Sequence, residues 1–121
     1  PAHATSMGKV LLASLDDARL DEYLSTAKLE RSLPRTVTDP KVLREQLMEI
    51  RAAGWALVDQ ELEEGLVAVA APVRHRDGHA VGAINLSTHV ARRDAESVRR
   101  ELLDPLLKTA RAIEADLAGV A

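Results

Sequence analysis

The sequence predicts an α+β fold in which helices pack on the faces of an antiparallel sheet. Helix patterns occupy the first half of the 121 residues, three strand-like runs follow, and a long helix pattern comes last. Helices and strands grouped in this way, without regular alternation, are typical of α+β folds. An Asp-Gly pair between the second and third strand patterns predicts a hairpin, and hence an antiparallel sheet. The length is that of one domain.

Two short helices are predicted first. Residues 4–13 fit a helix that Thr5 or Ser6 can cap, because hydroxyl groups accept hydrogen bonds from the first amides of a helix. Gly8 lies inside this helix, where glycine lowers helix stability. We therefore expect another group to approach the backbone closely at Gly8. Residues 16–25 fit a second short helix.

The third helix has the clearest boundaries. A loop is expected over residues 26–39, and Thr38 or Asp39 can serve as the N-cap. Pro40 then occupies the first helical position, where its missing N–H group is not needed. Gly54 is placed to end the helix in the left-handed conformation.

Three strands and a long helix complete the predicted fold. The strand patterns cover residues 55–61, 66–73 and 81–89. The last helix pattern covers residues 94–117 and has a regular apolar stripe. Pro105 lies within it and predicts a kink or a division, because proline lacks the backbone donor and clashes with the preceding turn.

Composition excludes several classes of function. The absence of cysteine excludes disulfides and thiolate metal sites and is compatible with the cytoplasm. The net charge of −3 and an aromatic content of 2% argue against direct nucleic-acid binding, which needs basic surfaces or stacking platforms. No membrane-spanning run, signal peptide, or catalytic, cofactor or metal motif is recognisable. These observations permit a cytoplasmic protein and give no indication of an enzyme or of a cofactor.

Two carboxylates stand out near the end of the first strand pattern. In a continuous strand Asp59 and Glu61 point to the same face, because side chains alternate. Such a pair can act as acid and base, hold a metal, or accept hydrogen bonds from a ligand hydroxyl. It can equally be a solvated acidic strand end.

Small and polar side chains share faces of the other two strands. Asn85 and Ser87 lie on one face of the third strand, and Ala68 and Ala70 on one face of the second. Small side chains leave room above a sheet, and polar groups can meet ligand oxygens. A wet sheet face, or a helix packed closely on the alanines, explains the same pattern.

The start of the first helix offers a further binding element. Thr5 and Ser6 bring hydroxyl groups next to the free amides of a helix N-terminus, which suit a carboxylate, although both residues can simply be caps. His75 and His79 have the spacing of metal ligands on a helix. Because they flank a predicted turn, we interpret them as surface histidines and predict no metal site.

Several segments, in order, resemble the IclR family of bacterial transcription regulators. They are residues 1–13 (PAHATSMGKVLLA), 58–66 (VDQELEEGL), 71–73 (APV), 77–78 (DG), 83–88 (AINLST) and 112–117 (AIEADL). The resemblance covers nearly the whole chain. Residues 55–65 and 85–89 are most similar to the branch that controls protocatechuate, 4-hydroxybenzoate and β-ketoadipate catabolism.

The resemblance implies an effector-binding domain with a GAF-like antiparallel sheet and helices on both faces. Residues 1–121 would form part of that domain, with its first strands and a winged helix-turn-helix expected upstream. The ligand-binding positions carried over from the family are Thr5, Ser6, Met7, Asp59, Glu61, Ala68, Ala70, Asn85 and Ser87. Ala68 stands where relatives often have cysteine, and Asn85 where they often have serine, which predicts a somewhat different acid.

The function implied is sensing of a small carboxylic acid, either an aromatic acid or a dicarboxylate of aromatic catabolism. Binding would rearrange the subunits of a homodimer or tetramer and change DNA affinity, with DNA contacted only by the N-terminal domain. Two alternatives remain open at this point. One is an oligomerisation module whose pocket is filled by its own side chains, and the other is an enzyme that uses Asp59 and Glu61.

Overall fold

A computed structural model describes residues 1–120 and confirms the α+β class. Apart from the short 3-10 helix η1, which the sequence did not predict, its helices and strands match the predicted ones in kind and order. They are η1 (Ala2–Ala4), α1 (Ser6–Ala13), α2 (Asp17–Thr26), α3 (Pro40–Ala53), β1 (Ala56–Asp59), β2 (Leu66–Arg74), β3 (Ala80–His89) and α4 (Ala95–Val120).

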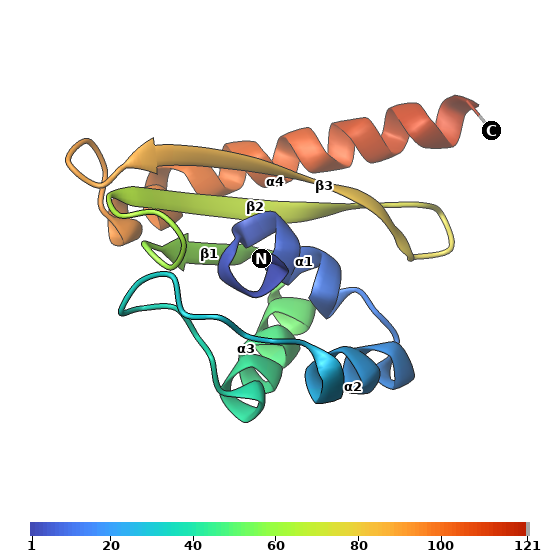
Figure 1. Ribbon diagram of the computed structural model, residues 1–121. Coiled ribbons are helices and arrows are strands. Elements are labelled where there is room, and N and C mark those ends of the chain that lie inside the picture. The colour runs from blue at the N-terminus through green and yellow to red at the C-terminus, as the bar shows by residue number, and fades with distance from the viewer. Residues whose placement is uncertain (121) are drawn as a thin grey trace.

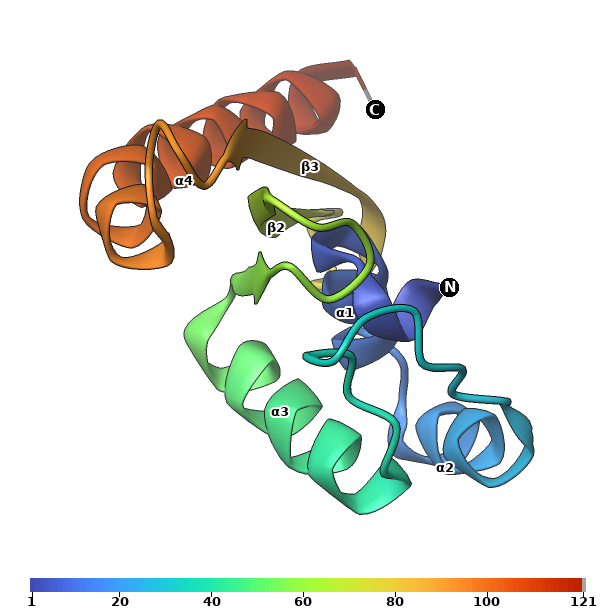
Figure 2. The ribbon, with the colours of Figure 1, turned by 60° about the vertical axis from the view of Figure 1, so that its left-hand side comes forward.

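The sheet separates the helices into two layers. Its strands lie in the order β1-β2-β3 and both neighbouring pairs are antiparallel, as the hairpin pattern predicts. Helix α4 runs along one face, while α1 lies on the other face with α2 and α3 beyond it (Figures 1 and 2). Because β2 is central, residues 67–73 are buried on both faces of the sheet.

Alternation along β2 divides the core into two parts. Val67, Val69 and Ala71 pack against α4, and Ala70 packs against α1. A third apolar cluster joins α1, α2 and α3 around the fully buried Leu20, Leu43 and Leu47. Helix α1 is thus held between the sheet and the other two helices.

The helix boundaries follow the predicted capping chemistry. The Thr5 hydroxyl accepts a hydrogen bond from the Gly8 amide at 3.0 Å. Asp39 accepts from the Lys41 amide at 2.9 Å, and Gly54 ends α3 with φ of 82°. Gly8 is also explained, because a Cβ atom there would lie 2.5 Å from the Cα atom of Ala2. The backbone of Ala2, at the start of η1, is the group that approaches Gly8 closely.

Helix α4 does not divide at Pro105. It continues over 26 residues, and Pro105, Glu101 and Asp104 are exposed. The carbonyl of Glu101, four residues before the proline, lies on this exposed side and can therefore bond to water. Packing of Val98 and Leu106 on the sheet holds both halves together. Within residues 1–120, no helix is both long and apolar enough to span a membrane.

Candidate functional site: a small cavity between α1 and the sheet

A cavity of about 170 Å³ lies where the start of α1 meets the sheet. Its lining comes from three parts of the chain that are distant in sequence: residues before and within the first turn of α1, the β1–β2 connection, and one face of the strands. The lining residues are Ala4, Thr5, Ser6, Met7, Val58, Glu61, Leu62, Glu63, Leu66, Ala68, Asn85 and Ser87. An apolar cavity of about 150 Å³ accommodates benzene, so the space suits a molecule with one ring.

The first turn of α1 supplies hydrogen-bond donors to the cavity. The amides of Ser6 and Met7 precede the point at which a helix has its own acceptors, whereas the Gly8 amide is bonded to Thr5. Ser6 is buried and Met7 is partly exposed at the cavity rim. Such amides, together with the helix dipole, favour a carboxylate.

The sheet supplies a floor of small and polar side chains. Ala68 pairs with Ser87 across the β2–β3 ladder, and both line the cavity together with Asn85. Asn85 and Ser87 are exposed, so the cavity is open along β3. Ala70, the partner of Asn85 in the ladder, does not line it.

Helix α1 covers Ala70. This alanine is fully buried against Val10 and Ala56. The two explanations for the small residues of β2 therefore apply to different positions: Ala70 makes room for close helix packing and Ala68 for the cavity.

The acidic pair does not form. Strand β1 ends at Asp59, and Gln60 has a left-handed φ of 57°, so the alternation of side chains stops there. The Gln60 side chain stabilises the β1–β2 connection, because its Oε1 atom accepts a hydrogen bond at 3.0 Å from the Gly65 amide. Asp59 points to Arg35, 2.5 Å away, and does not line the cavity. The predicted common face of Asp59 and Glu61 is therefore wrong.

Glu61 is buried beside the cavity and bound to Lys9. The Lys9 Nζ atom lies 2.9 and 2.8 Å from the two carboxylate oxygens, and it donates to Gln46 Oε1 at 2.6 Å. The side chains of Lys9 and Glu61 are 1% and 8% exposed. Burial lowers the pKa of Lys9 from its ordinary value, while the hydrogen bond and the charge of Glu61 oppose that shift.

Sequence reasoning missed Lys9, although a signal was available. Lys9 is the only charged residue between positions 4 and 15, and it stands directly before the apolar run of α1. A lone charge in an apolar helix usually has a buried partner. Its partner is 52 positions away, and spacing alone does not identify it.

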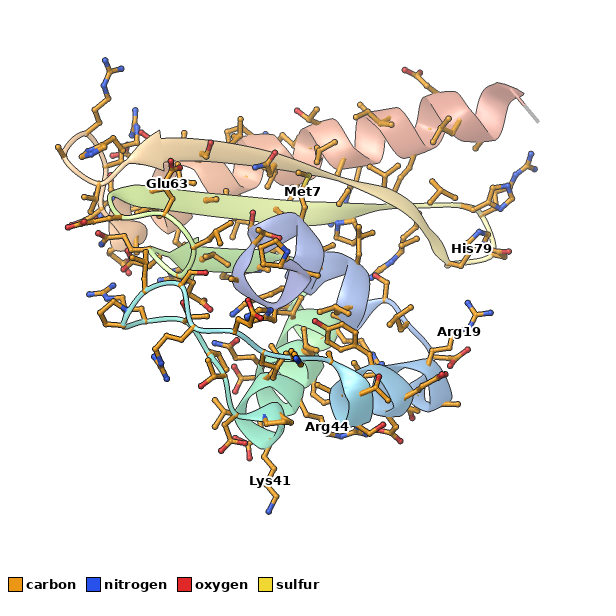
Figure 3. The ribbon with its side chains drawn as sticks, viewed as in Figure 1. Met7, Arg19, Lys41, Arg44, Glu63 and His79 are labelled. Carbon is orange, nitrogen blue, oxygen red and sulfur yellow. The ribbon has the colours of Figure 1, made fainter. Side chains whose placement is uncertain are left out.

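Most of the predicted binding residues converge on this cavity. Thr5, Ser6, Met7, Glu61, Ala68, Asn85 and Ser87 line it, and Asp59 and Ala70 do not. Figure 3 shows Met7 over the sheet and Glu63 in the β1–β2 connection, with His79 at the opposite end of the molecule. The site is therefore assembled from positions 5–7, 61–68 and 85–87.

The histidines of the β2–β3 hairpin lie outside this site. His75, Asp77 and His79 are exposed, with one possible ligand atom from each within 4.8 Å of the others. Asp77 accepts from the His79 amide at 3.0 Å, and the proximity of His79 lowers the pKa of the Asp77 carboxyl. These contacts stabilise a hairpin turn around Gly78, whose φ is 92°.

Comparison with known proteins agrees with this architecture. Residues 1–115 match the family described as the bacterial transcriptional regulator IclR C-terminal domain. Relatives include the Pca regulon regulatory protein of Pseudomonas putida, 42% identical over 98% of this chain and 41% of that protein. Another is the p-hydroxybenzoate hydroxylase transcriptional activator of Acinetobacter baylyi, 36% identical over 91% of this chain and 41% of that protein.

Solved structures give the same result. A transcriptional regulator from Rhodococcus sp. RHA1 superposes with a TM-score of 0.96 and 46% identity, over 99% of this chain and 49% of that chain. A double mutant of the PobR inducer-binding domain from Acinetobacter, in complex with 3-hydroxybenzoic acid, superposes with a TM-score of 0.89 and 34% identity, over 94% of this chain and 67% of that chain. The chain spans about two fifths of the length of the curated relatives it matches.

The two curated relatives named above are described as regulators of transcription. The match covers 115 of the 121 residues, and it agrees with the order of helices and strands around the cavity. The chain belongs to the IclR family of bacterial transcription regulators and corresponds to their C-terminal, effector-binding domain.

Proposed function

We propose that the cavity binds a small aromatic carboxylic acid and that this binding is the signal the domain transmits. The observation that supports the proposal is a cavity of about 170 Å³ lined by the first turn of α1 together with Asn85 and Ser87. The carboxylate would bind at the amides of Ser6 and Met7, because these are the unpaired donors of α1. The ring would lie over Ala68, whose methyl group leaves room above β2.

The hydroxybenzoic acid class fits the remaining groups. Ser87 and Asn85 offer donors and acceptors at the open side of the cavity, where a ring hydroxyl would reach them. A named relative supports this class, since a double mutant of the PobR inducer-binding domain has been solved with 3-hydroxybenzoic acid. Asp59 does not serve as an acceptor for the ligand in this proposal, because it pairs with Arg35 outside the cavity.

Binding would act by joining separate parts of the fold. A ligand that touches α1, the β1–β2 connection and β3 at once stabilises one relative arrangement of these segments. In a homodimer or tetramer, that arrangement would alter the DNA affinity of an N-terminal domain. The shift is limited by the difference in ligand affinity between the two arrangements. As a DNA-regulating protein, it would act in the cytoplasm.

Isothermal titration calorimetry tests the proposal. The chain is titrated with 3-hydroxybenzoate, 4-hydroxybenzoate, protocatechuate and β-ketoadipate. We expect saturable heat with at least one aromatic acid. Affinity should fall about tenfold for Ser87→Ala combined with Asn85→Leu, since each side chain would lose a hydrogen bond to the ligand worth about 1 kcal/mol. Turnover of an acid would instead indicate an enzyme.

The matched control is Thr88→Ala. Thr88 also lies on β3, but it pairs with Val67, and its side chain points to the opposite face of the sheet. This variant should bind like the wild type. Unchanged binding in the Ser87 and Asn85 variant, or no heat with any of the four acids, would overturn the proposal.

A further inference from the structure

We infer that Lys9 determines the specificity of the cavity for anions, because it pairs with Glu61 and leaves the cavity wall without net charge toward the ligand. The inference rests on the proposed function and concerns the same cavity. Lys9 does not line that space, so its effect would pass through Glu61.

Every donor of the Lys9 ammonium group has an acceptor. An ammonium group has three donors, and the Nζ atom has three acceptors: both oxygens of Glu61 and the amide oxygen of Gln46. Two residues of the loop before α3 hold Glu61 in place. The Thr36 hydroxyl donates to the Glu61 carbonyl, and the Val37 amide lies 3.4 Å from its Oε1 atom.

The pair forms part of a wall between two spaces. Glu61 faces the cavity at the start of α1, whereas Lys9 lines a neighbouring hollow of about 280 Å³ between α3 and β1. Gln46, Glu49 and Trp55 line the same hollow. A ligand in the cavity would therefore lie on the Glu61 side of the pair, whereas Lys9 lies on the side of the other hollow.

Without that balance, Glu61 would repel the ligands proposed above. Glu61 is buried, so water screens its charge little, and a ligand carboxylate close to it would be disfavoured. Glu63 also lines the cavity but is exposed, so solvent screens its charge. Glu61 is thus the charge that Lys9 must neutralise.

The test measures how the charge of the pair changes the preference for an acid over its neutral amide. Calorimetry compares 3-hydroxybenzoate with 3-hydroxybenzamide for the wild type, Lys9→Met, Glu61→Gln and the double variant. All four proteins are measured at the same pH. Thermal unfolding verifies that each variant is folded.

The acid-to-amide affinity ratio should follow the net charge of the pair. We expect it to fall about tenfold in Lys9→Met and to rise about tenfold in Glu61→Gln, and the double variant should stay within about threefold of the wild type. If Lys9→Met fails to fold, Glu61→Gln and the double variant still give two charge states to compare. A purely structural role would weaken acid and amide alike.

Arg35→Met is the matched control. It also removes a positive charge from an ion pair, but that pair is half-exposed and outside the cavity, so the ratio should not change. A ratio that is the same in all folded variants would overturn the role of Lys9 and leave acid binding intact. Absence of binding by the wild type would overturn both proposals.

Discussion

Replacement of Gly8 by alanine should destabilise the domain, although alanine is the better helix former. A Cβ atom at this position would lie 2.5 Å from the Cα atom of Ala2 and 2.5 Å from the Thr5 hydroxyl, and closer still to the Ala2 carbonyl oxygen. Two of these atoms are backbone, so the clash cannot be relieved by rotating a side chain. Either η1 moves away from α1 or the first turn of α1 opens.

Two opposing terms decide the magnitude. Alanine in a helix is favoured over glycine by about 1 kcal/mol. Overpacking against backbone costs about 1–3 kcal/mol or more, and loss of the Thr5 cap would add about 1 kcal/mol. The net expectation for Gly8→Ala is a loss of about 1–3 kcal/mol in the free energy of unfolding. Because Ala4 and Thr5 line the cavity, ligand affinity should fall as well.

Urea unfolding followed by circular dichroism measures this loss at an unchanged slope with denaturant. Gly119→Ala is the control, since Gly119 is also helical and a Cβ atom there would meet nothing within 4 Å. The control should be neutral or stabilising by up to about 1 kcal/mol. A Gly8→Ala protein as stable as the wild type would refute the close packing of η1 on α1.

Three further predictions follow from the site. Lys9→Met should lower the free energy of unfolding in urea by about 3–5 kcal/mol, because it leaves a buried carboxylate unpaired. Combining Lys9→Met with Glu61→Leu should recover most of this loss. A loss below about 1 kcal/mol in Lys9→Met would contradict a buried pair. Ala68→Leu should abolish binding of 3-hydroxybenzoate in calorimetry, because the leucine side chain fills the cavity. The free energy of unfolding should change by less than about 1.5 kcal/mol, because that space is already empty. Retained binding would locate the ligand elsewhere. Asp59→Ala should leave affinity within about twofold, because Asp59 belongs to a half-exposed ion pair outside the cavity; a tenfold loss would return Asp59 to the site.

Local chemistry made most of the fold predictable. Asp39, Pro40 and Gly54 define both ends of α3 through capping and a left-handed turn, which depend on a few consecutive residues. The Asp77-Gly78 turn likewise determines that β2 and β3 are antiparallel neighbours. The alternation of side chains along a strand also predicted that Asn85 and Ser87 share a face of β3, and both line the cavity.

Two predictions from local rules failed, one because of solvent exposure and the other because of the backbone conformation of a single residue. The rule that proline divides a helix did not hold at Pro105, because that residue lies on the exposed side of α4. The alternation that paired Asp59 with Glu61 stopped at Gln60, whose positive φ is rare for a residue other than glycine. A pattern of residue types does not reveal either circumstance.

The sequence by itself determined the kinds and order of the helices and strands and most of the segments that surround the cavity. Only the tertiary structure decided that Glu61 faces the cavity while bound to Lys9, that Asp59 turns to Arg35, and that α1 covers Ala70 but not Ala68. The physical reason is range. Caps, turns and periodicity act over a few residues, whereas the charge balance of a buried site depends on groups that meet only after the chain has folded.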